Sequence, residues 1–406
     1  MRSARQLHLT GAIIRLSGIT GVLASSIAAP YLLGATVYGF CSAAIAIPLS
    51  LQGLMEPGLN SIMIAHMRTR VGRAKIALTM RVMACLVVLG AVAIWFHLHN
   101  FIANAQTPDF FVFALLITFL ILFLLNTLLT GLAYALNSHH AIILGYTIPG
   151  VVFLVSVCLL SRFDARGFFL ATVAWQLTTT SLYFSNSRIR RSLALLARVQ
   201  PAPMLTGFAT EIVPAISSRI ALVSLNTFSV VWLAAVSTPD ATASFKVTLA
   251  MIGLLRFAIP ISPEIIQSLL EQSEKNPHRS TFQAIWLACG LAFFASGVLA
   301  FFADSVRARL LNTLDEPEML DYLFFAAPFL FCIAPLSSVL FAFRMKVTLA
   351  VSAMLCVVVQ FLFSYLFGVA QGVIAGSIVF VVAALPGLIC IRASDMPSNL
   401  GPDSCR

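Results

Sequence analysis

Hydrophobic residues occur along this chain in long blocks, and short polar interruptions separate one block from the next. A block of about 20 residues is long enough to cross ~30 Å of hydrocarbon as an α-helix. Backbone groups in lipid must find hydrogen-bond partners within their own segment, so the blocks are predicted to be helical. The pattern predicts spans at residues 9–33, 38–64, 76–98, 110–136, 141–161, 167–184, 205–236, 241–268, 281–302, 320–343, 347–369 and 372–391.

The composition agrees with this interpretation, because 60% of the residues are hydrophobic and only 10% are charged. A soluble domain carries about 25% charged residues, and a water-facing surface cannot be built from so few. We therefore expect an all-α integral membrane protein with about twelve transmembrane helices and no soluble domain. The first span follows Met1-Arg2-Ser3-Ala4-Arg5 without a small-residue cleavage site, so we interpret it as a retained helix and not as a signal peptide.

The basic residues indicate the orientation in the membrane. The formal net charge is +10, but the bases lie mainly in short loops, which is a topology signal and gives no reason to expect nucleic-acid binding. If the N-terminus is cytoplasmic, the outer segments hold only Arg162, Arg166, Arg307 and Arg309. The excess of bases on the other side predicts an even number of spans and two cytoplasmic termini.

Residues 186–203 separate six predicted spans from six, and they predict four parts of the chain. These are an N-terminal six-helix bundle at 1–185, a linker at 186–203, a C-terminal six-helix bundle at 204–392 and a cytoplasmic tail at 393–406. In the linker, Ile189, Leu193 and Leu196 recur at i, i+4 and i+7 among several arginines. This pattern predicts a basic amphipathic helix that lies on the inner leaflet and tethers the halves. An ordinary positive-inside loop is the alternative.

The two halves show weak internal similarity, as expected of transporters built from two related halves. Leu9-Thr10-Gly11 opens the first predicted span and Leu205-Thr206-Gly207 opens the seventh. Each of these spans carries an internal arginine, and a span with proline near its cytoplasmic end follows it. Near the C-terminus, Gly368, Gly372 and Gly376 share one helix face and favour close helix packing.

Ionisable residues inside spans are the candidate functional residues, because each costs about 2.5–3.5 kcal/mol on insertion scales. They fall only in the first, second, seventh and eighth spans, which we expect to line a shared wet cavity: Arg15, Glu56, Glu211, Arg219, Lys246, Arg256 and Glu264. Lys246 lies near the outer end of its span, where snorkelling to the interface explains it.

Depth suggests different roles for the others. Counted from the predicted start of its span, Arg219 lies near or beyond the midplane, whereas the rest lie in the cytoplasmic third or so. We expect Arg219 and Arg15, with Arg256, to bind an anionic headgroup, because guanidinium matches phosphate oxygens in a fork geometry. The acids are expected to act as gate partners or in ion coupling: Glu56, Glu211 and Glu264. The alternative for each is a salt-bridged packing residue.

No motif of an enzyme or a metal site is present. We find no phosphate loop, no Gly-x-Ser-x-Gly and no His-Glu-x-x-His. The eight cysteines are scattered, mostly within apolar blocks, and form no Cys-x-x-Cys, so packing is the favoured role. We expect no cofactor, no metal and no enzymatic activity.

The turn at residues 29–40, Ala-Pro-Tyr-Leu-Leu-Gly-Ala-Thr-Val-Tyr-Gly-Phe, resembles the first hairpin of the Wzx-type polysaccharide flippases. These belong to the multidrug/oligosaccharidyl-lipid/polysaccharide exporter (MOP) superfamily. Their hairpin typically shows Leu-Gly, a three-residue gap and Tyr-Gly. The second span, with Glu56-Pro57 and its basic loop, and the eighth span, from Ala243 to Pro260, are also similar.

The resemblance implies two six-helix bundles related by a pseudo-two-fold axis, with a cavity open to one face at a time. It implies export of an undecaprenyl-pyrophosphate-linked oligosaccharide across the inner membrane, with membrane lipids around the protein and contact with polysaccharide polymerase machinery as a further expectation. The first alternative is a cation-coupled drug or metabolite antiporter of the same superfamily. The second is a membrane-embedded glycan polymerase or transferase, against which the short loops count.

Overall fold

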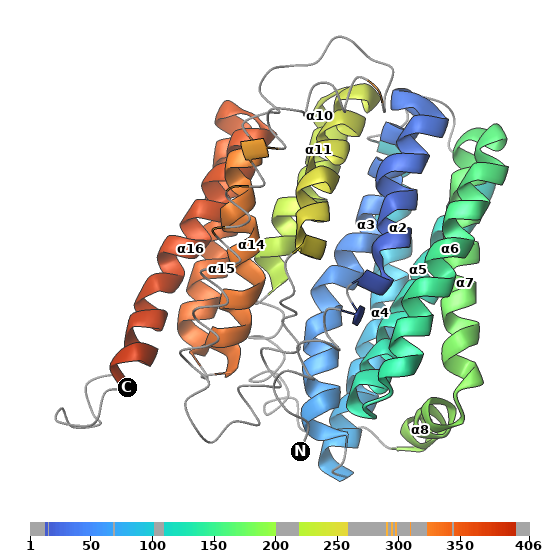
Figure 1. The fold of residues 1–406 in the computed structure, drawn as a ribbon, viewed down its shortest axis with the longest axis vertical. Coiled ribbons are helices and arrows are strands. Elements are labelled where there is room, and N and C mark those ends of the chain that lie inside the picture. Colours follow the sequence, from blue (N-terminus) through green and yellow to red (C-terminus); the bar gives the residue numbers. More distant parts are fainter. Residues whose placement is uncertain are drawn as a thin grey trace.

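The computed structural model describes residues 13–14, 16–67, 70–100, 109–199, 219–258, 323–342 and 345–394, with isolated positions at 290, 294, 297, 298 and 309. Every regular element in these residues is helical. The helices run roughly parallel, those of the first half on the right of Figure 1 and those of the second half on the left. Within the described residues, six stretches are long and apolar enough to cross a membrane: Ile19–Leu51, Phe110–Ala135, His139–Ser185, Arg219–Val236, Val347–Phe367 and Val369–Cys390.

The first half contains helices α2 to α7. Their bounds are α2 (Ile19–Leu23), the π-helical turn η1 (Ala24–Ala28), α3 (Ala29–His66), α4 (Arg70–Asn100), α5 (Phe110–Ala135), α6 (His139–Leu160), the short 3-10 turn η2 (Ser161–Phe163) and α7 (Asp164–Ser185). Helix α3 is interrupted at Gly34, whose φ of 75° and ψ of 169° end one span and begin the next. A positive φ of this kind favours glycine, because it has no Cβ to clash. The predicted boundary between the first two spans therefore lies within one residue of a real turn.

The second half is described in less of its length. Its elements are η3 (Ser224–Phe228), a second π-helical turn, followed by α10 (Ser229–Val236), α11 (Pro239–Ala258), α14 (Leu323–Ala342), α15 (Lys346–Phe367) and α16 (Val369–Ser394). The predicted spans agree with these helices within a few residues where the two can be compared. The predicted span at 281–302 lies outside the continuous described segments.

Glycines hold α15 and α16 together, as the sequence predicted. A Cβ at Gly372 would overlap the Ser364 hydroxyl, and a Cβ at Gly376 would lie 2.9 Å from the Cβ of Gln360. The turn between the helices is made by Gly368, with a φ of 103°. Gly372 and Gly376 thus let two backbones approach more closely than a larger side chain would allow. Gly368 does not share their helix face as expected, because it lies in the turn before α16.

At the end of the molecule that holds the α4–α5 and α6–α7 connections, Asp109 stabilises the start of α5. Its carboxylate accepts a hydrogen bond from the Phe111 backbone N–H at 2.9 Å and pairs with Arg166 Nε at 2.6 Å. The Phe111 N–H first, and then Arg166, hold the pKa of Asp109 below its usual value. The charge distribution predicts this end, at the top of Figure 1, to be the outer one.

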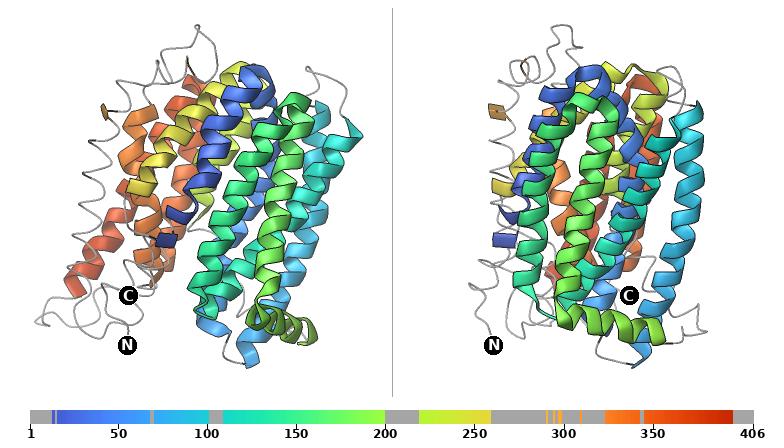
Figure 2. Two further views of the ribbon diagram at one scale, coloured as in Figure 1. Left: turned by 45° about the vertical axis from the view of Figure 1, so that its right-hand side comes forward. Right: turned by 90° about the vertical axis from the view of Figure 1, so that its right-hand side faces the viewer.

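The linker forms helix α8 (Ser187–Arg198), which runs across the lower end of the first half (Figure 2). The side chain of Asn186 caps it by accepting a hydrogen bond from the Arg188 backbone N–H at 3.0 Å. The helix predicted from the amphipathic pattern is therefore present, and the alternative of an ordinary loop is wrong.

Candidate translocation pathway

The two halves meet at their outer ends through the turns that follow the first and the seventh spans. Thr36 Oγ1 donates a hydrogen bond to Asp240 Oδ1 at 2.7 Å. One turn further along α3, Gly39 lies directly against Pro239, and a Cβ at position 39 would overlap the Pro239 carbonyl oxygen. A side-chain hydrogen bond and a close backbone approach thus hold α3 against α11 at this end of the interface.

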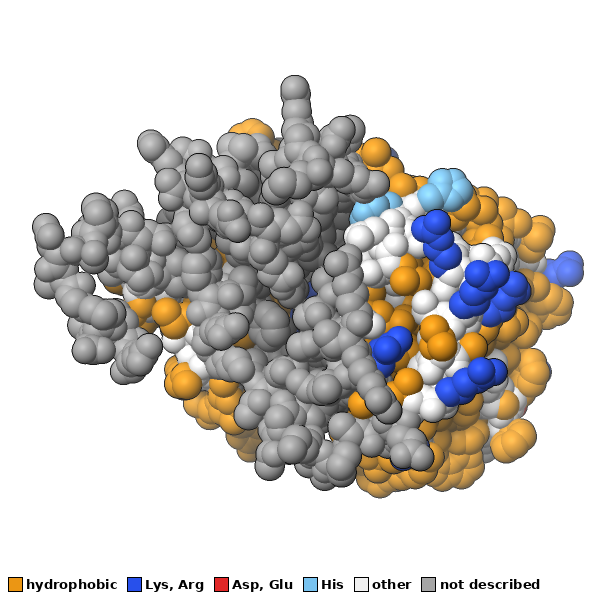
Figure 3. Space-filling view, turned by 90° about the horizontal axis from the view of Figure 1, so that it is seen from below, with side chains coloured by type: hydrophobic (Ala, Val, Ile, Leu, Met, Phe, Trp, Pro, Cys, Tyr) orange, Lys and Arg blue, Asp and Glu red, His pale blue; other side chains and the backbone are white. Residues whose placement is uncertain are grey.

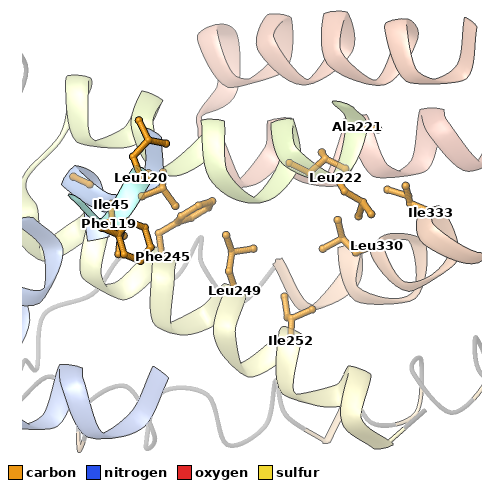
Figure 4. Packing of buried hydrophobic residues seen from close by; sticks show 14 of the residues in the cluster. Ile45, Phe119, Leu120, Ala221, Leu222, Phe245, Leu249, Ile252, Leu330 and Ile333 are labelled. Atoms are coloured by element: carbon orange, nitrogen blue, oxygen red, sulfur yellow. The ribbon is translucent and has the colours of Figure 1, made fainter. Parts of the chain in front are cut away.

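Below this contact, an apolar layer continues the interface. Figure 4 shows Phe245 of α11 directed toward Ile45 of α3 and toward Phe119 and Leu120 of α5. All four side chains are buried. Further along α11, Leu249 and Ile252 are directed toward residues of the second half, with Leu330 and Ile333 of α14 among them. Helix α11 therefore packs on α3 of the first half and on α14 of the second.

The halves approach each other again deeper in the membrane, where Gly53 of α3 faces the seventh span. A Cβ at Gly53 would lie 2.7 Å from Cγ2 of Val223. Helix α3 runs away from the outer end and the seventh span runs toward it, so the two are antiparallel. One turn inward from this contact, the backbone register places Glu56 of α3 and Arg219 of the seventh span at the same level.

Arg219 lies in the half of its span that is remote from the Thr36–Asp240 contact, and it is half-buried. It precedes Val236, the outer end of its span, by 17 residues, which at 1.5 Å per residue is about 26 Å of helix. In a hydrocarbon layer of ~30 Å this is well past the midplane, toward the side that the charge distribution predicts to be cytoplasmic. The sequence analysis counted from the predicted start of the span and placed Arg219 near or beyond the midplane. Counted from the observed outer end at Val236, Arg219 lies closer to the opposite end than that count suggested.

Arg256 of α11 lies at a comparable depth. It follows Pro239, the first residue of α11, by 17 residues, which again is about 26 Å from the outer end. Helix α3 packs against α11 and α10, and α10 packs against α11. Three of the residues singled out in the sequence therefore share one level on three neighbouring spans: Glu56, Arg219 and Arg256.

The other candidates have different outcomes. Arg15, Glu211 and Glu264 lie outside the described residues, so their roles stay predictions. Lys246 lies seven residues after Pro239, about 10 Å from the outer end of α11, as expected, and it is half-buried. Among the described residues, no cluster of three or more metal-ligating side chains occurs.

Sequence reasoning missed the polar residues that stabilise the irregular turns of the first and seventh spans. The Tyr38 hydroxyl donates to the Ser25 carbonyl oxygen at 2.9 Å. Gln360 of α15 donates through Nε2 to the Ser224 carbonyl oxygen at 2.8 Å. The available signal was weak: a small polar residue occurs in each of the two apolar spans, and a buried glutamine occurs in an otherwise apolar helix. Both turns lie in the span that opens a half, which adds a matching feature to the internal similarity.

No known protein family and no curated protein sequence matches the chain. Solved structures do match. The chain is similar to a lipid II flippase MurJ in an inward closed conformation, with 13% identity, a TM-score of 0.67, and 95% of this chain and 87% of that chain covered. It is also similar to an outward-facing multidrug resistance MATE family transporter of the MOP superfamily, with 15% identity, a TM-score of 0.56 and 98% of each chain covered.

A third similar structure is a MOP superfamily transporter from Pyrococcus furiosus, described as having a binding pocket of reverse polarity. The identity is 14% and the TM-score 0.54, over 96% of this chain and 95% of that chain. Sequence identity at this level supports a statement about fold. The predicted fold class, an all-α integral membrane protein with about twelve helices in two bundles, is confirmed. The chain therefore has the fold of the MOP superfamily of membrane transporters.

Proposed function

We propose that the protein is a flippase that translocates an undecaprenyl-pyrophosphate-linked oligosaccharide from the inner to the outer leaflet of a bacterial inner membrane by alternating access. The observation that carries this proposal is the level shared by Arg219 and Arg256, in the half of their spans that is remote from the Thr36–Asp240 contact. Two guanidinium groups on neighbouring spans suit a pyrophosphate, whose oxygens accept paired hydrogen bonds from each fork. The lipid II flippase among the similar structures is a precedent for such chemistry in this fold.

The contacts between the halves support the direction of loading. The outer ends are joined by Thr36 with Asp240 and by Gly39 with Pro239, and the apolar layer around Phe245 lies beneath them. The arginines lie on the inner side of these contacts. A headgroup that enters from the cytoplasmic side would therefore reach the positive charges before it meets the closed layer, as an inward-loading transporter requires.

The remaining residues take the roles expected from the sequence. Arg15 joins Arg219 and Arg256 in holding the headgroup, and Glu211 and Glu264 act as gate partners or in ion coupling. Glu56 shares the level of Arg219 across the interface between the halves, which supports a gate role for it. The division at 186–203 and the cytoplasmic termini belong to the same proposal. Contact with polysaccharide polymerase machinery is also part of this proposal.

A reconstituted system tests the proposal directly. Proteoliposomes loaded with a fluorescent lipid-linked oligosaccharide report the fraction of headgroup that a membrane-impermeant quencher reaches over time. Arg219→Gln is expected to slow translocation at least about tenfold, because a charge-assisted contact of roughly 1.5–3 kcal/mol is lost. Arg219→Lys retains the charge without the fork and should fall between.

Arg166→Gln is the matched control, because Arg166 is exposed and pairs with Asp109 away from the pathway. Full activity of Arg219→Gln, or equal loss in Arg166→Gln, would contradict the assignment. In cells, deletion of the gene should leave the lipid-linked sugar on the inner leaflet. Normal accumulation on the outer leaflet would end the flippase proposal.

A cation-coupled antiporter is the second candidate, and the position of Glu56 favours it, since a carboxylate at this level could bind a cationic substrate or a coupling ion. The MATE transporters with the same fold are its precedent. Uptake of a cationic dye driven by a proton or sodium gradient, abolished in Glu56→Gln but kept in Arg219→Gln, would select this function over the flippase.

A further inference from the structure

Helix α8 is held to the protein by the apolar face that its sequence pattern assigned to the membrane. Ile189 is 0% exposed and Leu196 is 1% exposed. The helix packs against α4, α5 and α7. The expectation that this face lies on the inner leaflet is wrong, because the ends of three spans cover it. Any contact of α8 with lipid must therefore be made by other residues.

A second stripe on the same helix remains exposed. Arg188, Arg191, Leu195 and Arg198 follow one another at intervals of three, four and three residues. At about 100° per residue these positions fall within an arc of roughly 80° on the helix surface. All four are exposed, and Leu195 is 51% exposed despite being apolar. Arg190 is also exposed but projects from the opposite flank.

The position of α8 fits an interfacial role. Figures 1 and 2 show the helix crossing the lower end of the first half, below α7 and on the side away from the second half. It runs nearly perpendicular to the spans, and hence along the plane of a membrane that the spans cross. In the described part of this face, Figure 3 shows Lys, Arg and His side chains and no acidic one.

We propose that the stripe formed by Arg188, Arg191, Leu195 and Arg198 is a binding surface for anionic phospholipid headgroups of the inner leaflet. Guanidinium groups donate paired hydrogen bonds to phosphate oxygens. The leucine between them inserts at the boundary of headgroup and acyl chain, as an apolar residue of an interfacial helix does. A soluble acidic partner could also bind the arginines. An exposed leucine among them would add nothing to such binding, whereas it favours binding to a lipid surface. This surface is separate from the transport pathway and does not depend on the substrate.

The test compares two neighbouring arginines that carry the same charge and are both exposed. Native mass spectrometry of the purified full chain, titrated with phosphatidylglycerol, gives an apparent Kd for the lipid. Arg191→Gln is expected to weaken this binding about fivefold, as the loss of one favourable basic residue at an anionic surface implies. Arg190→Gln, on the opposite flank, should change it less than about twofold, and Leu195→Ser should weaken it without any change in charge.

Each other outcome overturns the proposal. Equal effects of Arg190→Gln and Arg191→Gln would mean that only the total charge of the face matters. Unchanged lipid affinity in Arg191→Gln, together with weaker binding of polyglutamate, would assign the stripe to an acidic protein. Unchanged affinity for both probes would leave the stripe without a ligand. Gel filtration and thermal unfolding in the same detergent confirm that the three variants are folded.

Discussion

The first span of each half contains a π-helical turn, and the two turns are stabilised in different ways. Such a turn holds one residue more than an α-helical turn and disturbs the regular hydrogen-bond ladder. In the first span, at Ala24–Ala28, the Ser25 carbonyl accepts from Tyr38, only 13 residues later in the chain. In the seventh span, at Ser224–Phe228, the Ser224 carbonyl accepts from Gln360, which is 136 residues away.

The origin of these hydrogen bonds shows which helices of each half stabilise its irregular turn. Tyr38 belongs to the span that follows the first turn, so this hairpin satisfies its own irregular backbone. Gln360 also donates to Ser229 Oγ at 2.8 Å and accepts from Ser224 Oγ at 2.5 Å. Gly372 packs close to the Gln360 carbonyl. The irregular turn of the seventh span is thus hydrogen-bonded to the α15–α16 hairpin, whereas the turn of the first span accepts its side-chain bond from the next span in the chain.

Replacement of Gln360 by leucine should have the largest effect. It removes three hydrogen bonds and leaves the buried Ser224 hydroxyl without its Gln360 acceptor, whereas the Ser224 carbonyl keeps its bond from Ser229 Oγ at 3.2 Å. Each lost hydrogen bond contributes about 0.5–1.5 kcal/mol, and an unsatisfied buried group costs about 1–3 kcal/mol. We expect Gln360→Leu to lower the free energy of unfolding by about 3 kcal/mol, measured by thermal unfolding of the detergent-purified protein. A loss below about 1 kcal/mol would contradict the coupling of the bend to α15.

The same substitution in the first half, Gln176→Leu, is the matched comparison and should cost less. Gln176 is as deeply buried as Gln360 and accepts from Asn126 Nδ2 at 2.8 Å. Asn126 would keep its bonds to the Gln176 backbone oxygen and to Thr180, both 2.9 Å long. We expect a loss of about 1 kcal/mol in the same unfolding assay. If this variant proved as unstable as Gln360→Leu, the contrast between the halves would fail.

Removal of the Tyr38 hydroxyl should have the smallest effect. Tyr38→Phe keeps the ring and deletes one hydrogen bond to the Ser25 carbonyl, for which membrane proteins show about 0.6 kcal/mol on average. We expect a small drop in unfolding temperature and no change in hydrogen exchange of α15. Increased hydrogen exchange in α15 would show that the two π-helical turns are linked through the interface between the halves. The two turns would then not be stabilised independently.

The sequence predicted the spans well because a membrane helix needs a long apolar block and polar turns, and both are visible residue by residue. The close packing at Gly372 and Gly376 was predictable for the same reason, since spacing by four puts residues on one face. The π-helical turns were not predictable, because one additional residue within an apolar block leaves the hydrophobic pattern unchanged.

The candidate pathway was predictable only as a set of unusual residues. Arg219 and Arg256 stood out because charges are rare in spans, but their shared level depends on where two helices begin and end at the outer side. Thr36 and Asp240 are 204 residues apart, and no periodicity pairs positions across that distance. For α8, the pattern identified an apolar face correctly but could not show whether lipid or protein covers it.

The outer contact at Gly39 has an evolutionary consequence. Its counterpart is the carbonyl oxygen of Pro239, an atom that every amino acid possesses, so replacing the proline leaves the obstructing group in place. The contact therefore restricts which residue can occupy position 39 but not which residue can occupy position 239. Drift at position 239 should be visible among descendants of this sequence, whereas any lineage that gains a side chain at position 39 must first move two helices apart.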